Sequence, residues 1–407
     1  MKAILPKIKF KNFYEKWNRK TLQSIAPLRG GFAFKSEKFQ NVGIPIVRIS
    51  NIGFDGTVGG EFEYYSKLSP DEKFILKGRS LLLAMSGATT GKIAMLDSEE
   101  EYYQNQRVGY FQNNGAVDYD FLSSVLQTKA FTNQLNAVLV AGAQPNISSK
   151  EIDSFVFCIP ESLDEQSAIG YLFRTLDDLL ASYKDNLANY QSLKATMLTK
   201  MFPKAGQTVP EIRLDGFEEE WEEGTIGEFG SFYYGKSAPK WSVTDEATTP
   251  CVRYGELYTK FSTKIDKIYS YTSIPKENLK LSSGNEVLVP RVGENPLDFA
   301  NCSWLSVKDV AIGEMISVYN TPNNPLFIAY YFNARMKKEF AKRVEGGSVA
   351  NLYYTYLENI SISVPSLLEQ QAIGAYFSNL DNLIAAHQEK ISQLETLKKK
   401  LLQDMFV

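Results

Sequence analysis

Two short motifs and one histidine offer residue types that could support catalysis. Gly87–Lys92 reads Gly-Ala-Thr-Thr-Gly-Lys, which is close to a phosphate-binding loop but has one residue too few between its glycines. Ile93 stands where a Ser or Thr hydroxyl would hold magnesium, so we interpret the segment as a glycine turn between two strands. His387 is the sole histidine and lies on the apolar side of a helical pattern, which favours a packing role over that of a base or metal ligand.

Two further segments carry incomplete catalytic signatures. Asn324-Pro325-Leu326-Phe327 is near an adenine-methyltransferase motif, but it lacks the second proline and no glycine-rich cofactor loop precedes it. Pro70-Asp71 has no Glu-x-Lys downstream at nuclease spacing. We therefore expect no catalytic residues, no metal site and no cofactor-binding residues in this chain.

A duplication organises the sequence. Residues 165–202 return as 369–406 at a constant offset of 204, with 15 identities over 38 positions. Six residues near the start match the middle of the chain at the same offset, namely Pro6, Ile8, Phe13, Glu15, Trp17 and Thr21 with Pro210, Ile212, Phe217, Glu219, Trp221 and Thr225. The chain is thus a tandem repeat of two units of about 200 residues.

The repeated segments have the pattern of long helices. Each begins with a Ser-x-x-Glu capping box, Ser162–Glu165 and Ser366–Glu369. Apolar residues then recur at steps of three and four, including Leu193 in the first copy and Leu397 in the second, as in a coiled-coil seam. At 1.5 Å per residue each helix would be ~60 Å long and marginal in water alone, so we predict that the two pair antiparallel.

The remaining parts have short apolar runs typical of strands, such as 45–49, 80–85, 92–96 and 154–159, and one helix each, near 121–139 and 325–340. They keep one frame, since Val47-Arg48, Gly87, Gly142 and Asn146 match Val252-Arg253, Gly293, Gly347 and Asn351. The predicted fold class is α+β, with two globular domains separated by a pair of long antiparallel coiled-coil helices in a pseudo-two-fold tandem repeat.

We divide the chain into a first globular domain (1–158), a first long helix (159–204), an acidic connector (205–226), a second globular domain (227–364) and a second long helix (365–407). The connector reads as a solvated linker, with DNA mimicry as the alternative. The globular domains hold 19 and 15 Lys+Arg against 15 and 14 Asp+Glu, whereas the other segments hold 10 against 18. A phosphate-facing surface is therefore possible on the globular domains, without a long-range basic field.

Compartment and redox state follow from two further patterns. No window holds 18 uninterrupted apolar residues, and the start, residues 1–7, is too short and basic for a signal sequence. The three cysteines, Cys158, Cys251 and Cys302, lie far apart in apolar sequence and read as reduced structural thiols. We expect a cytoplasmic protein with no membrane partner.

This arrangement resembles the specificity subunit of type I restriction-modification systems along essentially the whole chain. The resemblance depends on the two variable domains, the duplicated Glu-Gln-x-Ala-Ile-Gly helices after a proline, the segments Gly142–Asn146 and Gly347–Asn351, and the repeated Leu-Asp pairs. It implies a non-catalytic, sequence-specific DNA-recognition subunit. Each target recognition domain would read one half of a bipartite, asymmetric site on double-stranded DNA, with the helices setting the gap between the halves.

The resemblance also implies partners. Two methyltransferase subunits would dock on this chain, and restriction subunits would join them for cleavage. S-adenosylmethionine, ATP and Mg²⁺ would then belong to those partners rather than to this chain. Whether the complex cleaves or only methylates, which bases it reads, how long the gap is, and the oligomeric state without partners do not follow from this sequence.

Candidate DNA contacts follow from residue type, because Arg reads guanine, Asn and Gln read adenine, and Lys, Ser and Thr hold phosphates. The candidates in the first domain are Arg29, Phe34, Lys35, Arg48, Asn51, Ser86, Thr89, Thr90, Lys92, Gln104, Asn105, Arg107, Gln144 and Asn146. Those in the second are Tyr233, Tyr234, Lys236, Lys240, Arg253, Tyr254, Arg291, Asn295, Ser348 and Asn351.

Structural roles compete with these contacts. Arg48 and Arg253 share a frame position, Asn146 and Asn351 are typical of turns, and aromatic side chains such as Phe34 and Tyr234 usually lie in a core. At the level of the whole protein, the rival hypotheses are a coiled-coil scaffold that joins protein partners without DNA and an enzyme that acts on DNA alone.

Overall fold

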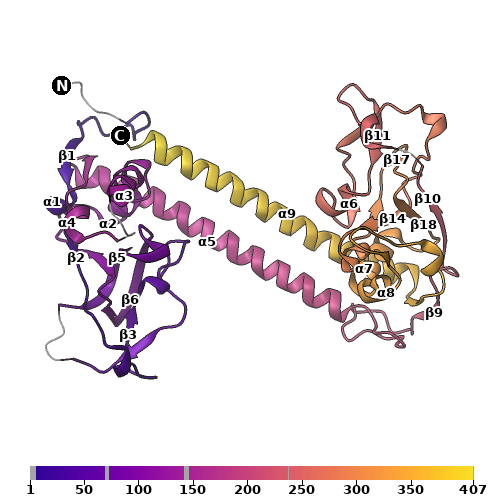
Figure 1. Ribbon diagram of the computed structural model, residues 1–407, viewed down its shortest axis with the longest axis horizontal. Helices are drawn as coiled ribbons and strands as arrows, with labels where there is room; N and C mark the ends of the chain where they lie inside the picture. Colours follow the sequence, from indigo (N-terminus) through magenta and orange to yellow (C-terminus); the bar gives the residue numbers. More distant parts are fainter. Residues whose placement is uncertain (1–5, 69–72, 142–145, 237, 407) are drawn as a thin grey trace. The chain divides into compact units, whose positions relative to one another are not determined.

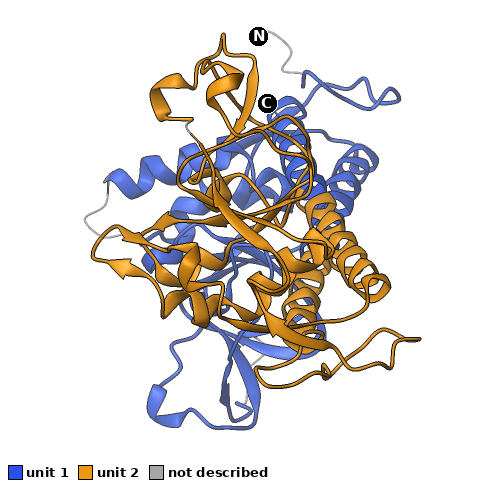
Figure 2. Cartoon of the chain, turned by 90° about the vertical axis from the view of Figure 1, so that its right-hand side faces the viewer, with its two compact units in different colours: residues 1–184, 389–407 blue, residues 185–388 orange. Residues whose placement is uncertain are grey.

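A computed structural model describes residues 6–68, 73–141, 146–236 and 238–406. Two long helices, α5 (Leu163–Lys200) and α9 (Leu367–Asp404), have 38 residues each (Figure 1). The chain forms two compact units, one of residues 1–184 and 389–407, the other of residues 185–388 (Figure 2). Each unit therefore contains the N-terminal part of one long helix and the C-terminal part of the other.

Unit 1 is built on a six-stranded sheet of order β2-β7-β5-β6-β3-β4 and a two-stranded sheet, β1-β8. Its strands are β1 (Asn18–Thr21), β2 (Leu28–Arg29), β3 (Ile44–Val47), β4 (Glu63–Tyr65), β5 (Ile75–Ala84), β6 (Ile93–Gln104), β7 (Val108–Phe111) and β8 (Val156–Ile159). Its helices before α5 are α1 (Leu22–Ile25), α2 (Tyr119–Val125), α3 (Lys129–Ala141) and α4 (Ser149–Asp153), with short 3-10 turns at Ser36–Lys38, Ile49–Asn51 and Gly87–Thr89.

Unit 2 has a five-stranded sheet of order β10-β18-β14-β16-β12, with smaller sheets β13-β11-β17, β15-β20-β19 and β21-β9. Its strands are β9 (Glu222–Thr225), β10 (Ser231–Tyr234), β11 (Thr249–Val252), β12 (Lys264–Ile265), β13 (Ser270–Thr272), β14 (Glu286–Pro290), β15 (Val292–Gly293), β16 (Ser303–Leu305), β17 (Ala311–Ile312), β18 (Ile316–Asn320), β19 (Glu345–Gly346), β20 (Ala350–Asn351) and β21 (Ser361–Val364). Its shorter helices are α6 (Glu256–Thr259), α7 (Pro325–Arg335) and α8 (Lys337–Ala341), with 3-10 turns at Lys240–Ser242, Lys276–Asn278, Pro296–Ala300 and Tyr354–Tyr356.

The sequence predicts one helix in each globular part, but each of these helices is divided in two, and α1, α4 and α6 are further short helices. Thr128 interrupts the first, because its hydroxyl accepts from the Phe131 N–H at 3.4 Å and so caps α3 just after α2 has ended. In unit 2 the pattern ends at Arg335 and resumes at Lys337. Apolar periodicity alone continued across both breaks, so these two predictions were wrong in detail.

The pairing of the long helices follows from two duplicated ion pairs. Lys398 of α9 contacts Asp177 of α5 in unit 1, and Lys194 of α5 contacts Asp381 of α9 in unit 2. Asp177 and Asp381 are the same position of the repeat, as are Lys194 and Lys398. An acidic residue early in each helix thus meets a basic residue late in the other, which makes the helix segments antiparallel within each unit.

The seam differs from the predicted one at two positions. Leu193 and Leu397 are 37% and 45% exposed, whereas the neighbouring lysines, Lys194 and Lys398, are partly buried in the ion pairs. His387 lies on the seam, with its ring centroid 5.1 Å from that of Tyr190, as the packing interpretation required.

Each long helix ends in the core of the unit that contains the start of the other long helix. Phe202, just after α5, is fully buried against Phe327 and Phe377 in unit 2. Phe406, just after α9, packs on Trp17 and Phe173 in unit 1. The repeated Met-Phe ending is therefore a core element of both units.

The capping boxes form only in part. Ser162 and Ser366 accept from the N–H groups of Glu165 and Glu369, at 3.3 and 3.4 Å. Both carboxylates are buried and have other partners. Glu165 accepts from the Trp17 indole at 3.2 Å, and Glu369 accepts two bonds from the Arg213 guanidinium at 2.8 and 2.7 Å.

The segment expected to be a solvated connector contributes to unit 2 instead. Trp221 is 2% exposed within the core, β9 pairs with β21, and Arg213 holds Glu369. The N-terminal segment of unit 1 contributes Trp17 and β1 to its unit in the same way. The structural role of residues 205–226 therefore follows from the duplication.

Candidate nucleic-acid interface

One end of the large sheet has the same backbone pattern in both units. Where β5 ends, the Met85 N–H donates to the Arg107 carbonyl at 2.9 Å, and the Met85 carbonyl accepts from Ile147 at 3.0 Å. Where β14 ends, the Arg291 N–H donates to the Met315 carbonyl at 3.1 Å, and the Arg291 carbonyl accepts from Leu352 at 2.8 Å. We call this set of strand ends and loops the shared loop end of each unit.

A glycine lets another strand reach the shared loop end. A Cβ on Gly31 would lie 2.3 Å from the Asn105 carbonyl oxygen, and one on Gly235 would lie 2.1 Å from that of Gly313. Only glycine allows this approach, which brings the segments after β2 and β10 beside the loops. This pair was not among the predicted residues, although the two glycines are separated by the repeat offset of 204.

In unit 1 the shared loop end gathers several of the predicted residues. The Ser86 backbone forms an isolated antiparallel β-bridge with Asn146. The Ser86 and Thr89 hydroxyl oxygens are buried and have no hydrogen-bond partner in the part of the chain that the structure describes. Arg107 is exposed and its N–H donates to the Asn105 side chain at 3.1 Å. Buried hydroxyls and an exposed guanidinium are groups that can hold a phosphate or a base edge.

Further candidates adjoin these residues. The Lys92 ammonium lies 2.9 Å from the centroid of the exposed Phe54 ring, and the Thr90 hydroxyl donates to Gly87 within the turn between β5 and β6. Lys35 is exposed and follows the segment whose close approach to the loops Gly31 allows. The turn interpretation of Gly87–Lys92 is confirmed, because this segment joins two antiparallel strands.

Four candidates of unit 1 have internal partners instead. Gln104 is fully buried and bonds to Arg29 through its side-chain oxygen, while Phe34 lies in an aromatic cluster with Tyr65 and Tyr103. Burial lowers the pKa of the Arg29 guanidinium, which also donates to the Ile75 carbonyl at 3.0 Å. The Asn51 amide is buried and holds the Gly59 and Glu61 carbonyls. Residue type alone could not distinguish these interior groups from surface ones, so their structural roles correct the prediction.

Arg48 and Arg253 have a mixed character. The Arg48 backbone N–H donates to the Asn51 side chain and its guanidinium contacts Glu63 at 3.4 Å. The Arg253 N–H donates to the Glu256 carboxylate at 2.9 Å, which is the same turn with another acceptor. Both guanidinium groups are half-buried at the shared loop end.

In unit 2 the shared loop end is aromatic. The Arg291 guanidinium lies 4.5 Å from the Tyr234 ring centroid and 5.3 Å from that of Tyr353. Tyr354 stacks on Phe232 and contacts Tyr234 at 4.6 Å. Burial raises the pKa of Tyr234, so its hydroxyl stays neutral at physiological pH. Tyr353 and Tyr354 were missed, although they directly follow the repeated Asn351-Leu352.

The other candidates of unit 2 are dispersed. Lys236, Lys240 and Ser348 are exposed, Asn295 caps a 3-10 turn through its side chain, and Asn351 is half-buried in β20. Tyr254 packs on the core and Tyr233 lies under the Lys280 ammonium at 4.6 Å. Burial raises the pKa of Tyr233 to about 12. In unit 1, Gln144 lies outside the described residues.

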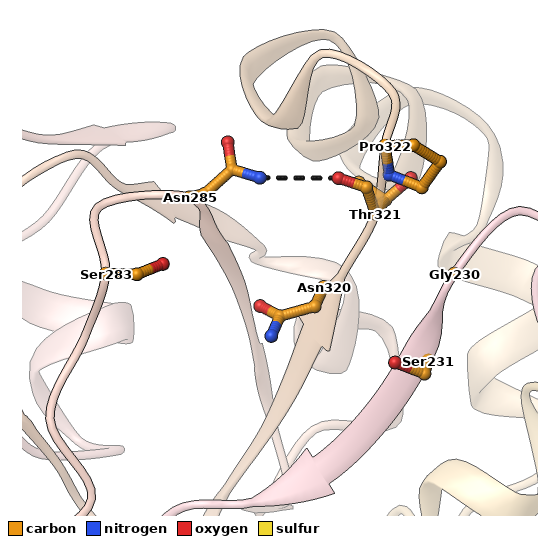
Figure 3. A pocket seen from close by; sticks show the side chains of 7 residues that line it. All are labelled: Gly230, Ser231, Ser283, Asn285, Asn320, Thr321 and Pro322. Atoms are coloured by element: carbon orange, nitrogen blue, oxygen red, sulfur yellow. Dashed lines mark hydrogen bonds between the residues drawn. The ribbon is translucent and has the colours of Figure 1, made fainter.

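Each unit also contains a hollow. A cavity of about 560 Å³ in unit 1 is lined by five aspartates, among them Asp120 and Asp177, against Arg79, Arg174 and Lys398. A pocket of about 340 Å³ in unit 2 lies at the opposite end of β14 and is lined by Ser231, Ser283, Asn285, Asn320 and Thr321 (Figure 3). The excess of carboxylates in the first and the lack of a cation among the lining residues of the second make both unsuited to phosphates.

The two incomplete motifs that the structure describes have structural roles. Asn324 caps α7 by accepting from Phe327 at 2.9 Å, and Gly87–Lys92 is the turn described above. All three cysteines are free and buried, and burial raises the pKa of the Cys251 thiol to about 11. Among the described residues there is no cluster of three His, Cys, Asp or Glu side chains fit for a metal ion, and no helix there has the length and apolar character needed to cross a membrane.

Comparison with known proteins agrees with the duplication. The family model for the type I restriction modification DNA specificity domain matches twice, at residues 14–189 and 218–396. The MjaVIII type I restriction enzyme specificity subunit of Methanocaldococcus jannaschii is 22% identical over 82% of this chain and 79% of its own. The putative MjaX specificity subunit of the same organism is 21% identical over 95% and 92%.

The fold has a counterpart among solved structures. The type I restriction-modification S subunit from M. genitalium matches 99% of both chains with a TM-score of 0.63 and 16% identity. At this identity the likeness concerns the fold, and it agrees with the predicted class of two α+β parts joined by long helices.

Proposed function

Because the chain belongs to the type I restriction-modification DNA specificity family, we propose that each of its two units binds one half of an asymmetric, bipartite site on double-stranded DNA. The observation that supports this most is the shared loop end. Its backbone hydrogen bonds are the same in both units, while the side chains that it presents differ. A common scaffold with divergent side chains is suited to read two different half-sites.

The long helices would set the gap between the half-sites. A helix of 38 residues is ~57 Å long at 1.5 Å per residue. One turn of B-DNA is ~34 Å, so readers carried toward the two ends of such a helix pair could reach successive grooves. In this proposal the target recognition domains are residues 1–158 and 227–364, with the spacer helices at 159–204 and 365–407.

Chemistry would be supplied by partners. Two methyltransferase subunits would dock on the chain, with S-adenosylmethionine as their methyl donor, and restriction subunits would bring ATP and Mg²⁺. A non-catalytic role for this chain is supported by the structural use of Asn324 as a helix cap and of Gly87–Lys92 as a turn.

The test is to express the chain with an adenine methyltransferase encoded beside it and to map methylated adenines by single-molecule sequencing. We expect one asymmetric bipartite motif with a fixed gap. The logarithm of the binding constant of the purified complex for a duplex carrying the motif should fall linearly with the logarithm of salt concentration.

The rival scaffold hypothesis makes the opposite prediction. A well-assembled complex that methylates no motif and binds DNA no better at low salt would support a scaffold that joins proteins. Purified chain with S-adenosylmethionine and Mg²⁺ but without the methyltransferase should be inert, and activity there would support an enzyme acting alone.

A further inference from the structure

One backbone-bonded pair of residues at the shared loop end consists of an arginine and a methionine in both units. The strand that carries the arginine in one unit carries the methionine in the other. In unit 1 the pair is Met85 at the end of β5 and Arg107 on the returning loop. In unit 2 it is Arg291 at the end of β14 and Met315 on the returning loop. The adjoining ladder pairs, Ala84 with Val108 and Pro290 with Ile316, confirm that the positions correspond. Each unit thus places the one arginine of this backbone pair at its shared loop end, from opposite strands.

Arg291 is held in place without an acidic partner. Its guanidinium lies over both the Tyr234 and the Tyr353 ring, and its Nε is buried with no hydrogen-bond partner among the described residues. No ion pair joins it to a carboxylate within the part of the chain that the structure describes. The Tyr354 ring packs on Tyr234 with 4.6 Å between the ring centroids, and we call Tyr234, Tyr353 and Tyr354 the aromatic clamp. A clamped guanidinium loses little further rotamer freedom on binding, which favours a defined, planar ligand.

Arg107 has the same position in the frame but no clamp. Its side chain is exposed, and among the described residues it forms no ion pair. Its backbone is fixed, because its N–H donates to Asn105 and its carbonyl accepts from Met85. The side chain is therefore anchored at its base and free at its tip.

Deepening the function proposed above, on which this inference rests, we propose that Arg107 and Arg291 each read a guanine, one in each half-site. The arginine fork matches the O6 and N7 atoms of guanine in the major groove. Because the two arginines come from opposite strands of the same backbone pair, the two guanines occupy different positions relative to their domains. This exchange makes the half-sites non-equivalent although the scaffold is duplicated.

The experiment uses the full chain assembled with its methyltransferase, with methylation measured on the genome and on synthetic duplexes with single base changes. We expect Arg291→Ala to lose about 10–100-fold of the discrimination for one guanine in one half-site, with the other half-site unchanged. Arg107→Ala should do the same for a guanine in the opposite half-site. Matched controls are Arg343→Ala, whose guanidinium pairs with Glu339, and the exposed Arg19→Ala.

Lysine variants distinguish a lost base contact from misfolding. Arg291→Lys keeps the charge over the rings but not the fork, so we expect the assembled complex to keep its melting temperature and lose the discrimination. A lysine variant that reads the guanine as well as the native chain would overturn the proposal. So would uniformly weaker methylation of an unchanged motif with a shallower salt dependence, which is the signature of a phosphate contact. If the native complex gives no bipartite motif at all, the function proposed above fails instead.

Discussion

The two units bury most of the repeated residues alike, but the last phenylalanine and the first glutamate of the repeat have different surroundings in each. In unit 2 Phe202 is fully buried and Glu369 has a bidentate arginine partner. In unit 1 the matching Phe406 is half-buried. The Glu165 carboxylate accepts from the Trp17 indole, and its second oxygen is buried with no hydrogen-bond partner among the described residues. The shared loop ends differ in the same direction, since Arg291 is clamped and Arg107 is not. Duplication thus preserved the backbone and most of the burial, while the partners of these particular side chains came to differ between the units.

The largest expected difference concerns the helix ends. Phe202→Ala should lower the free energy of unfolding by about 3–5 kcal/mol, because it leaves a cavity among Phe327, Tyr331 and Phe377. Phe406→Ala should cost less, about 2 kcal/mol, since its ring is already partly in water. Chemical denaturation together with hydrogen exchange of peptides from each unit measures both. Leu193→Ala, at an exposed position, is the control, and equal losses from both phenylalanines would contradict the comparison.

Substitution of the two duplicated glutamates by glutamine should change the stability of the protein in opposite directions. Burial raises the pKa of Glu165 above its ordinary value of 4.5, so its ionised form is disfavoured in the folded chain. Its contribution to stability is therefore greatest below pH 4.5 and is lost as pH rises through the raised value. Glu165→Gln should stabilise the protein at neutral pH, and the gain should vanish below pH 4.5.

Glu369→Gln, by contrast, removes a carboxylate charge. In the native chain this charge holds the Arg213 guanidinium and raises the pKa of Arg213. The substitution should destabilise the protein by about 2 kcal/mol at neutral pH. Thermal unfolding of both variants between pH 4 and 8 measures the effects. A shift of the same sign for both at pH 7 would show that the two sites are equivalent after all.

The smallest expected difference is between the two ion pairs of the long helices. Lys194→Asp and Lys398→Asp each place like charges together and should cost about 1 kcal/mol, the former more because Asp381 is 20% exposed and Asp177 is 40% exposed. Restoring opposite charge with Asp381→Lys or Asp177→Lys in the same chain should recover most of the loss. Double-mutant cycles in low and high salt measure this coupling, and a cycle without coupling would remove the ion pairs as determinants of helix register.

The elements that depend on local sequence could be predicted. The two long helices begin at their Ser caps, the runs at 80–85 and 92–96 lie in β5 and β6, and the glycine turn joins them. The match of Val47-Arg48 with Val252-Arg253 also placed these valines at matching strand ends. Helix caps, strand alternation and glycine turns involve neighbouring residues, so a single sequence contains their signal.

The candidate site could be predicted only in part. Arg29, Arg107 and Arg291 are chemically identical in the sequence, yet the first is bonded inside the sheet, the second is exposed and the third is clamped by tyrosines. Gln104 and Asn51 were plausible base readers whose amides satisfy buried backbone groups. Which side chain remains available depends on strand register and on neighbours far along the chain.

The sequence by itself determined that the protein is a duplicated α+β chain with two long helices, because repetition and local periodicity are written in consecutive residues. Only the tertiary structure decided that each helix ends in the core of the other unit, that Glu165 and Glu369 have different partners, and that arginine and methionine change strands between the units. These features join residues far apart in the sequence, such as Trp17 and Phe406. Their energies come from burial and from geometry between distant side chains, to which residue type and spacing contribute no direct signal.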